Sequence, residues 1–437
     1  MPGSVDPADV TGWGARHAHD PTAVRDDDDG TFYLFSTDAY SGGPVRAGVQ
    51  VRRSRDLVDW EFHGWALDGV PEAGARWSGA AGLWAPDVVR VGDEWRMYWS
   101  ASTFGSRTSA IGLAVAERPT GPWADRGLVV TSLHDVDGPN AIDANAVVDA
   151  DGRHWLAYGS FFGGIHVLEL DPATGLALDG DPADGLRPGA CVARRAASVE
   201  GAVEGAFVLP RPGGGHAMLV SYDSLFSTYH LRAGVAAHVA GPYRDRAGRL
   251  LTDVAADPGS VGTTILASHQ LAGGRAWLAP GHASVLTTPS PGGGEHQLLV
   301  HHVRDGADPT RHEAQVRRLL WTRSRWPVVS PQPWAGARET HETAPGPEVL
   351  PGRWEVVSLD GATGQVARSR PVLLGQADVA AAATDHGQGR LTWQRGAVAF
   401  DAVVFSSWDA VRQRTAWSFS GLDQHGRAAF GTRVGDA

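Results

Sequence analysis

Five short segments that each begin with a chemically active residue recur along this chain. Their first residues lie 64, 59, 61 and 78 positions apart. The segments are DPTAVR from Asp20, WAPDVV from Trp84, DANAVV from Asp143, EGAFVL from Glu204 and HASVLT from His282. If they occupy equivalent places in a repeat, three acids, a tryptophan and a histidine share one site. Two carboxyl groups flanking a glycosidic bond can hydrolyse it, so this set is typical of a glycosidase.

A Gly- or Asp-containing turn and a second apolar stretch follow each segment. These stretches are DGTFYLFST at Asp29, GDEWRMYWSAS at Gly92, DGRHWLAYGSF at Asp151, GGGHAMLVSYD at Gly213 and GGGEHQLLVHHV at Gly292. Repeats of roughly sixty residues built as strand, turn, strand are typical of β-propeller blades. The sequence therefore predicts an all-β fold with a five-bladed propeller, whose equivalent positions face one axis.

The repeat ends before the chain does. We expect the propeller to span residues 14–338, followed by a Pro-, Glu- and Thr-rich linker at 339–352. Residues 353–437 show the pattern of successive strands but lack the sixty-residue repeat. This pattern predicts a small, separate antiparallel β-barrel or sandwich. Either a structural cap or a sugar-binding surface using Trp393 or Trp417 fits this second domain.

Composition limits the partners. The net charge of −11 argues against a nucleic-acid groove, which needs a basic stripe. No stretch reaches the roughly 18 apolar residues of a membrane span. The first residues, MPGSVDPADVTGWG, lack the basic and apolar regions of a signal peptide, which predicts a cytoplasmic protein as written, or a secreted one if a leader was removed. The sequence predicts no particular oligomeric state.

Each acid has a simpler alternative. An Asp before Pro, as at Asp20, commonly starts a turn. Asp143 competes with Asp137, Asp149 and Asp151, but it follows the apolar Ile142, and an inward acid is costly without a purpose. Glu204 competes with Glu200, and it is favoured because it opens an apolar run. Trp84 is either core or a stacking surface for a sugar ring, and Asp87 is predicted to be structural.

Further motifs resemble a known family when taken together. They are HDP at 19–21, LWAPDV at 83–88, YWSASTFGS at 98–106, GPW at 121–123, NAIDAN at 140–145, YGSFFGGI at 158–165, VEGAF at 203–207 and PGHASV at 280–285. As a set they resemble glycoside hydrolase family 43, and within it the α-1,5-L-arabinanases, which are inverting five-bladed propellers. HHVRDG from His301 and HEAQVRRLLW from His312 are similar to the longer arabinanases with a C-terminal β-domain.

The resemblance implies a role for each site residue. Asp20 is the general base, Glu204 the general acid, and Asp143 tunes the pKa of Glu204 and orients it. Predicted substrate contacts are Trp84, Thr103, Phe104, Asn140, Ser160, Phe161 and Tyr222. His282 is a core histidine, an orienting group or a metal ligand, and the resemblance implies one calcium ion near it on the axis, although Ca²⁺ prefers oxygen ligands.

The expected function is inverting, endo-acting hydrolysis of α-1,5-linked L-arabinofuranosyl bonds in arabinan or arabino-oligosaccharides. The first alternative is an exo-acting α-L-arabinofuranosidase or β-xylosidase of the same family. The second is a non-catalytic sugar-binding propeller, which the three retained acids argue against.

Overall fold

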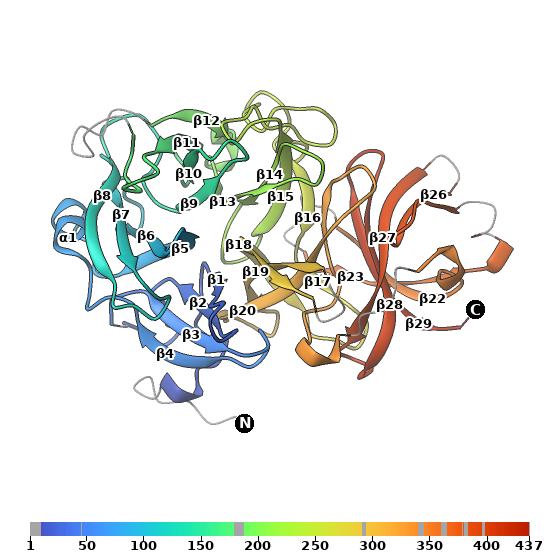
Figure 1. Cartoon of the computed structure of the whole chain (residues 1–437). Helices are drawn as coiled ribbons and strands as arrows, with labels where there is room; N and C mark the ends of the chain where they lie inside the picture. Colours follow the sequence, from blue (N-terminus) through green and yellow to red (C-terminus); the bar gives the residue numbers. More distant parts are fainter. Residues whose placement is uncertain are drawn as a thin grey trace.

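A computed structural model describes residues 10–44, 46–178, 188–290, 294–339, 345–359, 365–377, 379, 383–395 and 398–436. In these residues the fold is all-β, with five sheets arranged as propeller blades and a sixth, curled sheet of seven strands (Figure 1). The predicted fold class is thereby confirmed.

Each blade is a set of antiparallel strands, and the first strand given for each is its inner strand. Blade one is β1 (Thr22–Arg25), β2 (Phe32–Ser36), β3 (Gln50–Ser54) and β4 (Glu61–Trp65); blade two is β5 (Leu83–Val91), β6 (Glu94–Ala101), β7 (Ser109–Ala116) and β8 (Ala124–Ser132). Blade three is β9 (Asn145–Val148), β10 (His154–Tyr158), β11 (Ile165–Leu170) and β12 (Ala190–Ala193); blade four is β13 (Val203–Pro210), β14 (His216–Tyr222), β15 (His230–Ala236) and β16 (Thr263–Leu266). Blade five is β18 (Trp277–Pro289), β19 (Glu295–Asp305), β20 (Asp308–Trp321) and β21 (Pro327–Val329), extended at its inner edge by β17 (His269–Gln270) and β23 (Ala367–Arg368).

The inner strands touch in ring order, β1 to β5, β9, β13, β18 and back to β1. The N-terminal segment also helps to close the ring. The backbone of Arg16 forms an isolated antiparallel β-bridge with Glu313 on β20, and the amide of His17 donates to the carbonyl of His312. Apolar side chains on facing blades fill the space between them, as with Leu113 and Leu156. The closed ring places the starts of the five inner strands at one end of the propeller, where the site residues can come together.

The curled sheet has the strand order β24-β22-β29-β28-β27-β26-β25. Its strands are β22 (Gly352–Leu359), β24 (Arg370–Leu374), β25 (Ala383–Asp385), β26 (Arg390–Arg395), β27 (Val398–Asp409), β28 (Arg414–Asp423) and β29 (Ala428–Gly435). Val357, Phe405 and Phe430 belong to the same apolar cluster as Leu319 and Val328 of blade five. The curled sheet thus shares one apolar cluster with the propeller, while Trp354 and Leu391 belong to a second cluster of its own.

The predicted linker is partly built into the structure. Residues 340–344 lie outside the described residues, whereas Leu350 is buried in the core of the curled sheet after the short 3-10 turn Pro347–Val349. One short helix, α1 (Glu72–Ser78), precedes blade two. Among the described residues, no helix has the length and apolar character needed to cross a bilayer.

Candidate active site

A one-residue bulge lies near the start of the inner strand in blades one to four and in the interior of β18 in blade five. Each bulged residue has left-handed backbone, with φ of 50°, 38°, 62°, 57° and 48° at Asp20, Ala85, Asp143, Gly205 and His282. The pairing register shifts there in blades two, four and five. Bulges bend a strand and re-aim side chains next to active sites.

The bulges correct the predicted repeat alignment. Trp84 and Glu204 were expected to be equivalent to Asp20, Asp143 and His282. In the structure Ala85 and Gly205 hold the equivalent places, and Trp84 and Glu204 lie one residue earlier. Sequence spacing alone does not reveal a one-residue offset at a bulge.

A ring of inter-blade hydrogen bonds fixes these bulges. The amide of each bulged residue donates to a side chain of the preceding blade: Ala85 to Thr37 Oγ1 at 2.8 Å, Asp143 to Ser100 Oγ at 3.1 Å, Gly205 to Asp143 Oδ2 at 3.1 Å, His282 to Ser221 Oγ at 2.8 Å and Asp20 to His302 Nδ1 at 3.2 Å. In blade three the position opposite the bulge is Gly159, and the carboxylate of Asp143 supplies the acceptor instead. The backbone behind Glu204 is therefore held by a neighbouring acid.

Asp20 is surrounded by donors. Its Oδ2 accepts a 2.6 Å hydrogen bond from Thr37 Oγ1, and its Oδ1 lies 2.8 Å from His19 Nδ1 and 3.1 Å from His282 Nδ1. Burial alone would raise the pKa of Asp20, but the charges and hydrogen bonds of His19 and His282 hold that pKa well below its usual value. Asp20 is therefore a carboxylate at neutral pH.

Glu204 and Asp143 have the opposite electrostatic environment. Glu204 Oε2 accepts from Ser160 Oγ at 2.7 Å, and its Oε1 accepts from the Tyr229 hydroxyl at 2.8 Å. Burial raises the pKa of Glu204 above its usual value, despite these two donors and His282. Burial also raises the pKa of Asp143, with Glu204 and Asp20 adding to the shift and His282 opposing it. The two acids titrate as a pair that retains a proton where Asp20 does not.

His282 lies among all three acids. Burial by itself would lower its pKa, but Asp20 and Asp143 raise the pKa of this imidazole to about 9. The space is tight, because a Cβ at position 205 would meet His282 Nδ1 at 2.9 Å. His282 is thus a cation that stabilises the ionised form of Asp20.

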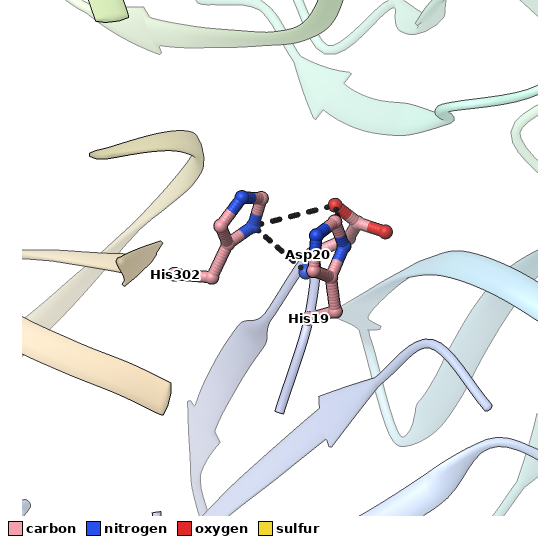
Figure 2. A group of neighbouring side chains, drawn as sticks. All are labelled: His19, Asp20 and His302. Carbon is pink, nitrogen blue, oxygen red and sulfur yellow. Dashed lines mark hydrogen bonds and ion pairs between the residues drawn. The ribbon is translucent and has the colours of Figure 1, made fainter. Parts of the chain in front are cut away.

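The predicted calcium finds little support in the described residues. His282 Nδ1 already faces Asp20, so this residue offers a metal one further nitrogen. Among the described side chains, one group of metal-capable atoms converges within 4.8 Å, formed by His19, Asp20 and His302 (Figure 2). There the His302 Nδ1 lone pair accepts the Asp20 amide, and the group has a single carboxylate. Ca²⁺ takes six to eight oxygen ligands, so these residues do not fit it.

Four predicted substrate contacts are at least partly buried in the propeller, and one of them, Ser160, touches an acid. Ser160 is buried against Glu204, and Phe161, with φ of 52°, follows it and donates its amide to the carbonyl of Val203. Trp84 is half-buried at the inner end of β5. Asn140 is buried, with its amide nitrogen 3.5 Å from the carbonyl of Ser106.

Other predicted contacts lie elsewhere. Thr103 and Phe104 are exposed in the loop between β6 and β7, with Phe104 83% exposed, and their contact with substrate stays a prediction. Tyr222 was predicted to contact substrate, but it is 1% exposed, and Arg195 and Arg232 each lie over its ring. As the last residue of β14 it points into the core between blades, so a substrate role is wrong for it.

The acids that competed with Asp143 and Glu204 lie outside the site, and Asp137 and Asp151 are exposed. Glu200 is exposed at the end of a 3-10 turn, and Asp149 accepts from Trp155 Nε1 within its own turn. Asp87 is buried and accepts from Thr22, Asn145 and the amide of Ala146, joining blades one, two and three. Its predicted structural role agrees with these contacts.

Three residues of the site were not predicted from the sequence. Thr37 lies opposite the first bulge, His302 is fully buried on β19, and Tyr229 precedes β15. The register of PGHASV against HHVRDG could have indicated His302, because antiparallel pairing sets His302 opposite Gly281, the residue before His282. Nothing comparable indicated Tyr229, which reaches the site from a loop.

The comparison with known proteins agrees with this geometry. The sequence pattern of glycosyl hydrolases family 43 matches residues 14–327, which cover the propeller. The chain belongs to glycosyl hydrolase family 43. The three acids therefore lie in the propeller of a family 43 glycoside hydrolase, at the shared inner ends of its blades.

Individual relatives add detail. An extracellular endo-α-(1→5)-L-arabinanase of Bacillus subtilis is 26% identical over 464 residues, covering 95% of this chain and 92% of that protein. An extracellular exo-α-(1→5)-L-arabinofuranosidase of Cellvibrio japonicus is 31% identical, covering 71% and 86%. The crystal structure of the family 43 YxiA protein from Bacillus licheniformis superposes with a TM-score of 0.80 at 25% identity, covering 95% and 98%. The first and third of these similarities extend over the curled sheet as well as the propeller.

Proposed function

We propose that this family 43 enzyme is an inverting, endo-acting hydrolase of α-1,5-linked L-arabinofuranosyl bonds in arabinan and arabino-oligosaccharides. The observation that carries the proposal is the opposite electrostatic environment of two acids. Histidines hold Asp20 ionised, whereas burial keeps a proton on the Glu204–Asp143 pair. A base and an acid that differ in this way are what acid–base hydrolysis of a glycoside requires.

Each side chain then has a defined task. Asp20 takes a proton from a water molecule whose oxygen attacks the anomeric carbon. As the glycosidic C–O bond breaks, Glu204 gives its proton to the leaving oxygen. Asp143 holds the Gly205 amide and disfavours ionisation of Glu204, and the His282 cation preserves the carboxylate of Asp20. Trp84 is proposed to stack on a sugar ring.

The endo assignment is supported by the two-domain relative. The Bacillus subtilis endo-arabinanase aligns over both the propeller and the curled sheet. The Cellvibrio japonicus exo enzyme aligns over 71% of this chain, and its 31% identity makes exo action the second candidate. Both relatives are described as extracellular, which favours the secreted alternative over a cytoplasmic location.

The test is hydrolysis of linear arabinan by the purified protein, with viscosity and products followed together. Internal cleavage lowers viscosity early and yields mixed oligosaccharides before monomer. Release of arabinose from the first minutes at nearly constant viscosity would establish the exo alternative. Nitrophenyl arabinofuranoside and xyloside, assayed alongside, should be poor substrates because they leave subsites empty.

A calcium ion near His282 remains a separate proposal, and no catalytic step depends on it. Elemental analysis of the purified protein before and after chelation tests it. Stoichiometric calcium, together with loss of thermal stability on chelation and recovery on adding calcium, would support the site. Metal-free protein of unchanged stability would leave His282 with its electrostatic role alone.

A further inference from the structure

Three aromatic rings lie in series between the residue proposed as base and the residue proposed as acid. The ring of His19 stacks on that of His302 at 3.8 Å, and His302 stacks on Tyr229 at 5.5 Å with 10° between the planes. At one end, His19 Nδ1 lies 2.8 Å from Asp20 Oδ1. At the other end, the hydroxyl of Tyr229 donates to Glu204 Oε1 at 2.8 Å. The stack therefore connects the two groups that must flank the bond.

The middle ring is fixed by its surroundings. His302 is fully buried, and its Nδ1 accepts the amide of Asp20 at 3.2 Å, as Figure 2 shows. Accepting that hydrogen bond leaves the ring proton on Nε2. Burial and the nearby His19 hold the pKa of His302 well below its usual value, so the ring stays neutral. A neutral ring between two others packs without adding a charge beside Asp20.

The outer ring, Tyr229, depends on a glycine of the PGHASV motif. A Cβ on Gly281 would lie 2.1 Å and 2.2 Å from Cδ1 and Cε1 of Tyr229. Only glycine leaves room for the ring beside the backbone that leads into His282. Burial and the charge of Glu204 raise the pKa of Tyr229 well above its usual value, so its hydroxyl remains a donor. Gly281 and Tyr229 are thus fitted to each other.

We propose that Tyr229 is a positioning residue for Glu204, and that the stack of His19, His302 and Tyr229 is a spacer that fixes the acid relative to the base. The proposal rests on the proposed roles of Asp20 and Glu204. Stacked rings cannot be compressed, and side chains held by packing and hydrogen bonds keep catalytic groups in productive geometry. The structural alternative, that Tyr229 merely fills the core, predicts a change in stability and nothing else.

The Tyr229→Phe variant keeps the ring and removes the hydroxyl. We expect kcat on linear arabinan to fall about tenfold with KM within about twofold, because the acid loses one of its two orienting hydrogen bonds. A nitrophenyl arabino-oligosaccharide should be cleaved at nearly the wild-type rate, since its leaving group needs little protonation. The alkaline limb of kcat/KM should move to higher pH, because the lost donor favoured ionised Glu204. Asp20, Asp143 and His282 also face Glu204 and are unchanged in this variant.

The matched control is Tyr243→Phe. Tyr243 is equally buried, and its hydroxyl donates to the carbonyl of Val239 at 2.9 Å. Its loss should lower thermal stability without moving the alkaline limb or separating the two substrates. If Tyr229→Phe behaves like this control, the positioning role is wrong.

The Tyr229→Leu variant tests the spacer. Removing the ring frees one face of His302, so the base is also misplaced, and activity on both substrates should fall well below that of Tyr229→Phe. Equal activities of the Phe and Leu variants, with thermal melts showing both folded, would overturn the spacer. If Glu204→Gln proves as active as the wild type, the proposed function fails; if that variant is inactive while Tyr229→Phe is unimpaired, only the positioning role fails.

Discussion

The backbone amide of Gly205 donates a 3.1 Å hydrogen bond to Oδ2 of Asp143, so Asp143 holds the residue that directly follows Glu204. The equivalent amides of the other four blades each donate to a side chain of the preceding blade. That side chain comes from the position opposite the bulge of its own blade. In blade three that position is Gly159, which has no side chain to offer. An acid in this place orients the backbone that follows Glu204, and we propose that its charge also disfavours ionisation of Glu204.

Replacing Glu204 should abolish most turnover of polymer. Glu204→Gln keeps the side-chain shape and one acceptor oxygen but has no acidic proton to give, so kcat on linear arabinan should fall by roughly 10²–10⁴. Steady-state kinetics measure the loss. Glu200→Gln, on the exposed neighbour, is the control and should be close to wild type. The reverse outcome would mean that the acid in this blade has been misassigned.

Replacing Asp143 should move the alkaline limb of the pH profile. Glu204 must be protonated to act, so activity declines as pH rises through its pKa. Asp143→Asn removes a like charge, which lowers the pKa of Glu204 and shifts the alkaline limb to lower pH, by about one unit. The pH dependence of kcat/KM reports this, with Asp149→Asn in the turn of the same blade as a control. An unmoved or upward-shifted limb is incompatible with the proposed role.

Replacing His282 should move the acid limb. Asp20 must be ionised to act, so activity declines as pH falls through its pKa. His282 is one of the two histidines that hold this pKa low, so His282→Gln should raise it and shift the acid limb upward by about one pH unit. Exposed His238 provides a control, as His238→Gln. If only calcium content changes and the acid limb stays in place, His282 is a metal ligand rather than an electrostatic partner of Asp20.

Much of the fold and the site could be predicted from sequence because the repeat is regular. The spacing of the repeats alone predicted that Asp20, Asp143, Glu204 and His282 share one site, because a propeller brings equivalent positions of its repeats together. The one-residue offset of Trp84 and Glu204 could not be predicted, because a left-handed bulge residue such as Ala85 has no signature in its side chain. Tyr222 was misassigned because its motif lies at a strand end whose side chain turns inward under two arginines.

The residues that the sequence missed reach the site by tertiary contact. Tyr229 arrives from a loop, and only packing against Gly281 and His302 directs its hydroxyl to Glu204. The packing of the curled sheet against the propeller could not be predicted from the sequence either. Val357 and Phe405 lie in the part of the chain expected to form a separate domain, yet they pack in one cluster with Leu319.

The stereochemistry of the product tests most directly whether Asp20 and Glu204 act as base and acid on opposite sides of the bond. If Asp20 activates water, their carboxyl groups should stand about 6.5–9.5 Å apart and the configuration should invert at each cleavage. Proton NMR of arabino-oligosaccharide hydrolysis, recorded before mutarotation, resolves the anomer formed first. The β-anomer from an α-linkage is the predicted result, and the α-anomer as the first product would contradict the account.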